Sequence, residues 1–91
     1  MTTTCCYHLT LFGVADSRAT QRARDNLQCF CARELGGNCL LDFIDVLTQP
    51  ALALERKILV TPTLVLDEPK PERRVIGDLS DVRRLRAGLG L

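Results

Sequence analysis

The side chains of this chain that could do nucleophilic or redox chemistry are five cysteines and a single histidine. Cys5, Cys6 and His8 lie together near the start, and Cys29 and Cys31 lie two positions apart further along. Thiolates act as nucleophiles, redox groups and metal ligands. Two kinds of chemistry therefore need to be considered: thiol redox catalysis and metal binding.

A metal site is poorly supported by the spacing of these residues. Zinc sites usually combine two closely spaced ligand pairs, and no second pair accompanies Cys5, Cys6 and His8. Cys29 and Cys31 fall on a predicted helix, where two residues are separated by roughly 200° and so point to opposite sides. We expect no metal, no cofactor and free thiols, as is usual in a cytoplasmic chain.

The hydropathy pattern predicts the element order β-α-β-α-β-β-α. Alternation over residues 7–12 predicts a strand, and an apolar stripe (Ala23, Leu27, Phe30, Cys31, Leu35) predicts a helix over 18–35. Residues 39–46 are apolar on both faces, which predicts a central parallel strand buried by helices. A short helix should follow, capped by Thr48 and with Pro50 in its first turn; its expected apolar members are Leu52, Leu54, Ile58 and Leu59. Strands are expected at 63–66 and 73–76, joined across 67–72. A last helix should be capped by Ser80, with Val82, Leu85 and Leu89 on its inner face.

The junction Thr61-Pro62-Thr63 stands directly before the third expected strand. A proline there lacks an N–H for the sheet and pushes the preceding residue out of the helical region, so Pro62 is a candidate for a cis peptide bond. Thioredoxin-like proteins carry a proline at this junction, beside their active site. The element order also resembles theirs, so we expect an α/β, thioredoxin-like fold with a mixed central sheet.

The cysteine pair of redox-active thioredoxin-like proteins is missing. Their Cys-x-x-Cys stands at the start of the first helix, where residues 15–20 read Ala-Asp-Ser-Arg-Ala-Thr here. Without a thiol at that place, a redox enzyme is disfavoured. His8 lies in a strand and is expected to be structural, and Asp42 and Asp45 should point to opposite faces of theirs. We expect Asp45 to bond backbone donors of the following turn, and no catalytic residue.

Length and charge reduce the number of function classes that fit this chain. With 91 residues and a net charge of +1, residues 1–91 are expected to form one domain, with residues 1–6 flexible. The charge does not favour nucleic acid, and the chain lacks an apolar run long enough to cross a membrane. The start does not resemble a signal peptide, so we expect a cytoplasmic protein.

Several blocks of the chain resemble the KaiB family of cyanobacterial clock proteins, from residue 7 to the end. The blocks, in matching order and spacing, are residues 44–47 (Ile-Asp-Val-Leu), Pro50, residues 57–59 (Lys-Ile-Leu), residues 61–64 (Thr-Pro-Thr-Leu), residues 73–74 (Arg-Arg), residues 76–80 (Ile-Gly-Asp-Leu-Ser) and residues 88–89 (Gly-Leu). Together these blocks are specific, although each alone would be weak.

The resemblance implies a non-enzymatic protein-binding module. KaiB-like proteins dock on the KaiC ATPase, and the docked complex captures KaiA and competes with a sensor histidine kinase. Arg22 and Arg74 match basic positions of the family, and with Asp45 and Pro62 they are our candidate partner-binding residues. The first helix, the second strand and the Pro62 loop would form the binding face.

The resemblance also implies two folds. One is a thioredoxin-like monomer that binds partners, and the other is an oligomeric ground state, a dimer or tetramer, with a rearranged C-terminal half. The candidate structural and fold-switch positions are Pro62, Pro69, Pro71, Gly88 and Gly90. Because Ser80, Asp81 and the spacing of the following apolar residues favour a terminal helix, we expect the thioredoxin-like monomer.

Some positions depart from the family pattern. The first loop, residues 17–20, lacks the usual proline, and Asp42 and Leu66 stand where the family commonly has basic residues. These departures indicate a divergent KaiB paralogue. They also keep a second hypothesis open, a stress or signalling adaptor that uses the same face for another partner.

Overall fold

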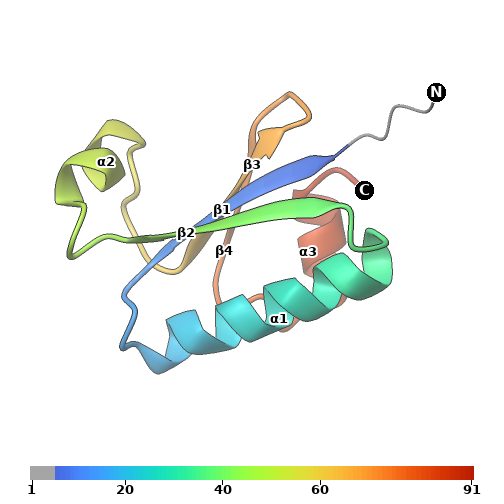
Figure 1. Ribbon diagram of the computed structural model, residues 1–91, viewed down its shortest axis with the longest axis horizontal. Helices are drawn as coiled ribbons and strands as arrows, with labels where there is room; N and C mark the ends of the chain where they lie inside the picture. Colours follow the sequence, from blue (N-terminus) through green and yellow to red (C-terminus); the bar gives the residue numbers. More distant parts are fainter. Residues whose placement is uncertain (1–5) are drawn as a thin grey trace.

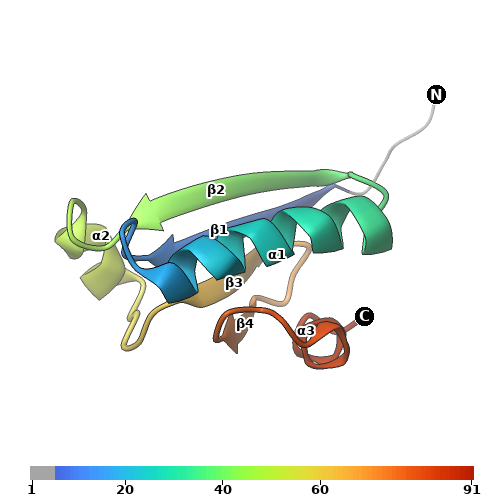
Figure 2. The ribbon, with the colours of Figure 1, turned by 90° about the horizontal axis from the view of Figure 1, so that it is seen from below.

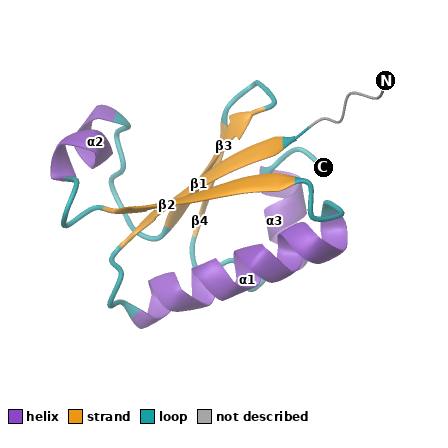
Figure 3. Ribbon diagram, in the orientation of Figure 1, coloured by secondary structure: helices purple, strands orange, loops and turns teal. Residues whose placement is uncertain are grey.

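The computed structural model describes residues 6–91, which follow the predicted order β-α-β-α-β-β-α (Figure 1). The elements are β1 (Tyr7–Gly13), α1 (Arg18–Glu34), β2 (Cys39–Asp45), α2 (Pro50–Glu55), β3 (Thr63–Glu68), β4 (Arg73–Ile76) and α3 (Val82–Gly88). Figure 3 shows the same arrangement by type of element. Apart from Cys6, the segment expected to be flexible lies outside the described residues, as does Cys5 of the N-terminal cysteine group. Among described residues, no helix is long and apolar enough to cross a membrane.

The strands form one mixed sheet in the order β2-β1-β3-β4. β1 pairs in parallel with β2 and antiparallel with β3, and β3 pairs antiparallel with β4. The prediction that residues 39–46 form a central strand is wrong. β2 is an edge strand, and Leu40, on the face away from α1, is 60% exposed. Apolarity on both faces indicated double burial, but the sheet order, which depends on contacts distant in sequence, places β1 in the centre.

Helices α1 and α3 cover one face of the sheet and enclose the core (Figure 2). The core joins residues of β1, β3 and β4 to the two helices: Leu9, Leu11, Ala23, Leu27, Phe30, Leu64, Leu66, Val75, Leu79, Leu85 and Leu89. The predicted stripe of α1 is confirmed, with Leu35 partly buried. Thr20 is also fully buried, and its hydroxyl is satisfied there because it accepts a hydrogen bond from the N–H of Val14, the residue after β1.

The short helix α2 lies at the end of the sheet where β1 and β2 finish (Figure 1). Its predicted apolar side is wrong for Leu54 and Leu59, which are 80% and 92% exposed. Leu52 and Ile58 are half-buried as members of that side, and Ala53 is the buried residue of the helix. The Thr48 cap is also wrong. Gln49 is the N-cap and makes no side-chain capping bond, and the Thr48 hydroxyl donates instead to the Asp45 carbonyl.

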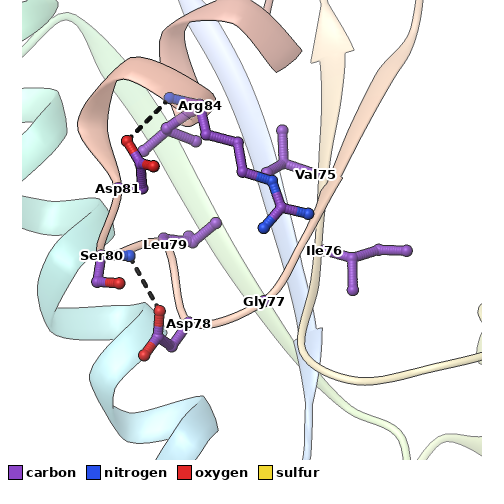
Figure 4. Close-up of a pocket in the computed structure, with 9 residues that line it drawn as sticks. Val75, Ile76, Gly77, Asp78, Leu79, Ser80, Asp81 and Arg84 are labelled. Carbon is purple, nitrogen blue, oxygen red and sulfur yellow. Dashed lines mark hydrogen bonds between the residues drawn. The ribbon is translucent and has the colours of Figure 1, made fainter.

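Helix α3 begins one residue later than the Ser80 cap predicts. The Asp81 carboxylate caps the helix by accepting from the Arg84 N–H, and the Ser80 N–H donates to the Asp78 carboxylate in the preceding turn (Figure 4). Both carboxylates accept hydrogen bonds from backbone N–H groups that would otherwise lack partners. Leu85 and Leu89 are buried as predicted, whereas Val82 is exposed.

The expectation that all thiols are free is wrong for one pair. Cys31 near the end of α1 and Cys39 at the start of β2 form a disulfide, with Cα atoms 6.4 Å apart. Gly36 and Gly37 both have positive φ and turn the chain back so that the two residues meet. Cys6 and Cys29 are exposed and free. The cellular compartment indicates whether thiols are usually free, but it does not indicate which cysteines a turn brings together.

Candidate functional site

The candidate site is the edge of the sheet that carries the Pro62 junction. The carboxyl ends of β1, β2 and β4, the first turn of α1 and the start of β3 all meet at this edge (Figure 1). The Thr61–Pro62 bond is cis, as predicted, and the Pro62 carbonyl accepts a hydrogen bond from the Gly77 N–H at 3.0 Å. Pro62 itself is buried. The junction thus joins β3 to the loop that follows β4.

The start of α1 has no thiol at the place where redox-active thioredoxins carry one. Ser17 caps the helix, with its hydroxyl oxygen 3.4 Å from the donating Thr20 N–H. Asp16 lies just before the cap and places a negative charge there. The local structure resembles an active-site edge, but it lacks the thiol that thiol redox chemistry requires at this place.

Asp45 shapes the chain between β2 and α2. One oxygen of its carboxylate accepts from the Leu47 N–H at 2.9 Å, and its carbonyl accepts from the Gln49 N–H at 2.9 Å and the Thr48 hydroxyl at 3.1 Å. The prediction that Asp45 bonds backbone donors of this turn is confirmed. Its carboxylate therefore has a structural role at the same edge as Pro62.

Arg22 lies on the exposed side of α1, near the loop that follows β4. The Asp78 carboxylate in that loop accepts hydrogen bonds from Ser80, which lower the pKa of Asp78, and the positive charge of Arg22 lowers this pKa further. The Asn26 side-chain amide donates to the Asp78 carbonyl at 2.9 Å. Arg22 is thus on the side of the sheet that α1 and α3 cover.

Arg74 lies on the opposite face of the sheet, because its neighbour Val75 points into the core. Its guanidinium donates to the Arg56 carbonyl at 2.6 Å, to the Lys57 carbonyl at 3.3 Å and to the Glu72 carboxylate at 3.0 Å. The sequence-based hypothesis grouped Arg22 with Arg74. The structure brings Asp45 and Pro62 to one edge but separates the two arginines onto opposite faces.

A second polar group on this opposite face was missed by sequence reasoning. The Thr10 hydroxyl donates to the Asp67 carboxylate at 2.6 Å, and the Arg56 guanidinium donates to the other carboxylate oxygen at 2.7 Å. The Arg56 guanidinium carbon also lies 5.6 Å from the centre of the Phe12 ring. Asp67 was assigned to the β3–β4 connection. Its alternation with the core residue Leu66 is the signal that would have placed it inside the strand.

The electrostatics of Asp67 follow from these contacts. Partial burial raises the pKa of Asp67, but the hydrogen bonds from Thr10 and Arg56 and the charge of Arg56 outweigh it, so the pKa lies below its ordinary value. The group is therefore ionised at neutral pH. Together Arg56, Asp67, Glu72 and Arg74 form the polar network of this face.

An open cavity of about 430 Å³ lies between this face of the sheet and α2. Asp67 and Arg56 line it, together with Phe12, Ile44 and Leu52. At one side of the cavity, His8 Nε2 lies 2.8 Å from Asp42 Oδ2, which ties β1 to β2. His8 thus has the structural contact expected of it. Among described residues, no group of three or more His, Cys, Asp or Glu side chains is arranged to hold a metal ion.

Exposed apolar side chains gather around α2. Leu54 belongs to the helix and Leu47, Leu59 and Val60 to its flanking segments, and Leu59 is 92% exposed. We call these four residues the α2 surface. Exposed leucines in such number on one short segment are typical of a protein-binding surface. This surface continues along the chain into the Pro62 junction.

The remaining candidate fold-switch positions lie in the C-terminal half. Pro69 and Pro71 occupy the exposed turn between β3 and β4, and both follow cis peptide bonds. Gly88 ends α3 where a Cβ would lie 2.5 Å from a Val75 methyl group, so the helix approaches β4 closely there. Gly90 follows with a φ of +76°. A role of these residues in a change of fold stays a prediction.

Comparison with known proteins agrees with this architecture. The chain is 40% identical over 83 residues to the circadian clock protein KaiB3 of Synechocystis, covering 91% of this chain and 81% of the relative. It is 45% identical over 85 residues to the circadian clock oscillator protein KaiB of Prochlorococcus marinus strain MIT 9312, covering 93% and 81%.

Solved structures share the fold at lower identity. The N-terminal domain of Synechococcus elongatus SasA superposes with a TM-score of 0.75 at 23% identity, covering 99% of this chain and 89% of that domain. Mitochondrial thioredoxin 3 of Saccharomyces cerevisiae superposes with a TM-score of 0.73 at 16% identity, covering 97% and 81%. These likenesses concern the fold alone, which is thioredoxin-like as predicted. A family model described as the KaiB domain matches residues 10–91, and with the sequence relatives it shows that this chain belongs to the KaiB family.

Proposed function

We propose that this chain is a non-enzymatic protein-binding module of a circadian clock or a clock-like system, and that it docks on a KaiC-type ATPase. The observation that carries the proposal is the match to KaiB clock proteins over 93% of the chain. In this proposal residues 1–91 act as one domain, in the cytoplasm, as a monomer in the thioredoxin-like state. The docked complex would then recruit a KaiA-like protein or compete with a sensor histidine kinase.

The docking face is the edge of the sheet with the Pro62 junction, the first turns of α1 and the adjoining α2 surface. Apolar side chains such as Leu59 and Leu54 are available there for burial against a partner. Arg22 borders this edge on one face of the sheet and contributes charge. Such a mixture of an apolar centre and charged neighbours is typical of protein–protein interfaces.

Thiol redox catalysis is a less well supported function for this thioredoxin-like fold. It requires a reactive thiol at the start of α1, where the chain has Asp16 and Ser17. The Cys31–Cys39 disulfide lies at the far end of α1 and cannot take that place. An insulin-reduction assay is expected to show no turnover, and turnover comparable to that of a thioredoxin would contradict the assignment.

A second function, a stress or signalling adaptor for another partner, is favoured by two positions. Leu66 is 2% exposed and belongs to the core, so it offers nothing to a partner where the family commonly has a basic residue. Asp42, at another such position, is paired with His8. The loss of both positive charges favours a changed partner.

Binding to a KaiC-type ATPase tests the main proposal. Purified chain is incubated with the ATPase and nucleotide for up to a day, and the mixture is analysed by sedimentation velocity. The chain alone should sediment as a monomer, and the mixture should contain a stable complex. Absence of any complex after the longest incubation would contradict docking and leave the adaptor function as the better explanation.

A matched pair of variants tests where on the surface the docking face lies. Leu59→Ser lies on the α2 surface, whereas Leu91→Ser lies at the end of the chain and is also exposed. We expect Leu59→Ser to weaken the complex by tenfold or more, on the order of a hot-spot residue. Leu91→Ser should leave the affinity unchanged. Equal losses from the two variants would contradict this placement.

A further inference from the structure

Helix α2 has few apolar contacts that could fix it in place. It contains six residues, of which Ala53 is buried, and Gln49 provides no side-chain cap. A helix of this length is not stable in water by itself, because nucleation costs more than so few backbone hydrogen bonds return. Its position must therefore be maintained by contacts with the sheet.

Arg74 provides such a contact at the end of the helix. Its Nη2 donates to the Arg56 carbonyl at 2.6 Å and its Nη1 to the Lys57 carbonyl at 3.3 Å. Carbonyls at the C-terminal end of a helix lack intrahelical partners and carry partial negative charge, so a guanidinium is well suited to bind them. One side chain of β4 thus binds the backbone at the end of α2.

Arg56 provides the second contact, in the reverse direction. It is the C-cap residue directly after α2, and its guanidinium donates to the Asp67 carboxylate on β3 at 2.7 Å and lies 3.7 Å from the Glu72 carboxylate. Arg74 of the sheet therefore binds backbone carbonyls at the end of α2. In return, the side chain of the C-cap residue Arg56 is bound by the carboxylates of Asp67 and Glu72. The two contacts restrain both the position and the rotation of the helix.

The guanidinium of Arg74 has all three of its nitrogens engaged within the chain. Nε donates to Glu72 at 3.0 Å, and the two terminal nitrogens donate to α2. A side chain in this arrangement would have to break good hydrogen bonds before it became the main contact of a partner. Arg22 is likewise exposed, but its contribution is a charge effect on the Asp78 carboxylate, so the two arginines differ in their contacts rather than in their exposure.

We propose that Arg74 is a positioning residue of the docking face: it acts through α2, which it holds with Arg56 so that the α2 surface is presented to the partner. This inference rests on the proposed function and names how one of its basic residues contributes. Arg22 and Arg74, which look equivalent in the sequence, then have different roles.

Amide hydrogen exchange of the free chain tests the first part. Arg74→Ala should increase exchange at residues 53–58 by about tenfold or more, since local opening of α2 becomes easier, while β1 and β3 keep their protection. Arg74→Lys should recover part of the protection, because an ammonium can bind one carbonyl. Arg73→Ala is the matched control, since it removes the same charge from the same strand on the face near α3. Unchanged exchange at 53–58 in Arg74→Ala would overturn the proposal.

A double-mutant cycle with the KaiC-type ATPase tests the second part. Arg74→Ala and Leu54→Ser are each expected to weaken binding by about tenfold, and the double variant should lose far less than the product of the two effects, because both act through α2. Losses that multiply fully would show that Arg74 contacts the partner independently and would overturn the proposal. If the wild-type chain does not bind, the proposed function fails, and the exchange experiment still decides whether Arg74 holds α2.

Discussion

The two faces of the sheet are held to their helices by different forces. On one face, α1 and α3 bury a continuous apolar core that includes Leu9, Leu64 and Leu85. On the other, α2 is held chiefly by Arg56, Asp67 and Arg74. Apolar burial does not depend on the ionisation of a side chain and is not screened by salt, whereas charge-assisted hydrogen bonds at a partly exposed site respond to pH and to ionic strength. The face covered by α1 and α3 therefore contributes most of the free energy of unfolding, whereas the position of α2 depends on charged side chains.

The largest expected effect concerns the core face. Leu85→Ala removes a side chain that is 1% exposed and leaves a cavity between α3 and the sheet. We expect a loss of about 2–5 kcal/mol in the free energy of unfolding, measured by urea titration. Val82→Ala, on the exposed side of the same helix, should cost much less. Similar losses for the two variants would contradict the assignment of the inner face of α3.

The disulfide is expected to have the next largest effect. Cys31 and Cys39 are eight residues apart, and closing a loop of that size stabilises by about 2–3 kcal/mol in the chain-entropy description. Cys39→Ser should lose about that amount in non-reducing buffer, and the wild type should lose a similar amount in dithiothreitol. Cys29→Ser, which removes an exposed free thiol, is the control. A wild type whose stability is the same with and without reductant would refute the prediction.

A smaller, pH-dependent effect is expected on the α2 face. Because the pKa of Asp67 is lowered in the folded chain, its contribution is present above the unfolded pKa of about 3.9 and is lost as the pH falls through the folded value. Asp67→Asn should cost about 1–2 kcal/mol at pH 7, since it removes charge-assisted hydrogen bonds. It should also flatten the decline of stability below about pH 4.

Stability measured from pH 7 to pH 2.5 checks this prediction. Asp25→Asn on the exposed side of α1 serves as the control for removal of one carboxylate and should leave the stability at pH 7 nearly unchanged. If Asp67→Asn declines in stability below about pH 4 as steeply as the wild type, or costs no more at pH 7 than Asp25→Asn, Asp67 does not hold α2 in the way described.

The smallest expected effect is a gain in stability. Lys57, just after α2, has a φ of +59°, a conformation that costs a non-glycine residue energy. Lys57→Gly should raise the free energy of unfolding by about 0.5–1 kcal/mol, and Glu55→Gly within the helix should lower it by a similar amount. Urea midpoints of the two variants should therefore move in opposite directions. Movement in the same direction would argue against the observed end of α2.

The sequence predicted local structure well and long-range structure less well. Element order, the stripe of α1 and the cis bond before Pro62 depend on neighbouring residues, and all three are confirmed. The edge position of β2 and the contact between Cys31 and Cys39 depend on how distant segments meet, and both were missed. Periodicity indicates which residues are apolar, but it does not give the order of the strands.

The candidate site shows the same division. Asp45 was predicted to bond the following turn, and it does so over a span of a few residues. Arg74 bonds residues 17 and 18 positions away, and Thr10 bonds Asp67 across 57 positions. Such contacts join separate elements, so sequence spacing could not reveal that Arg22 and Arg74 lie on opposite faces.

The most direct test of the account is hydrogen exchange of this chain with and without a bound KaiC-type ATPase. We predict slower exchange at residues 46–62 and at the first turns of α1, with little change in α3 and the centre of the sheet. Protection confined to α3, or none at all in a saturated complex, would contradict the claim that the chain binds its partner through the edge formed by Pro62 and α2.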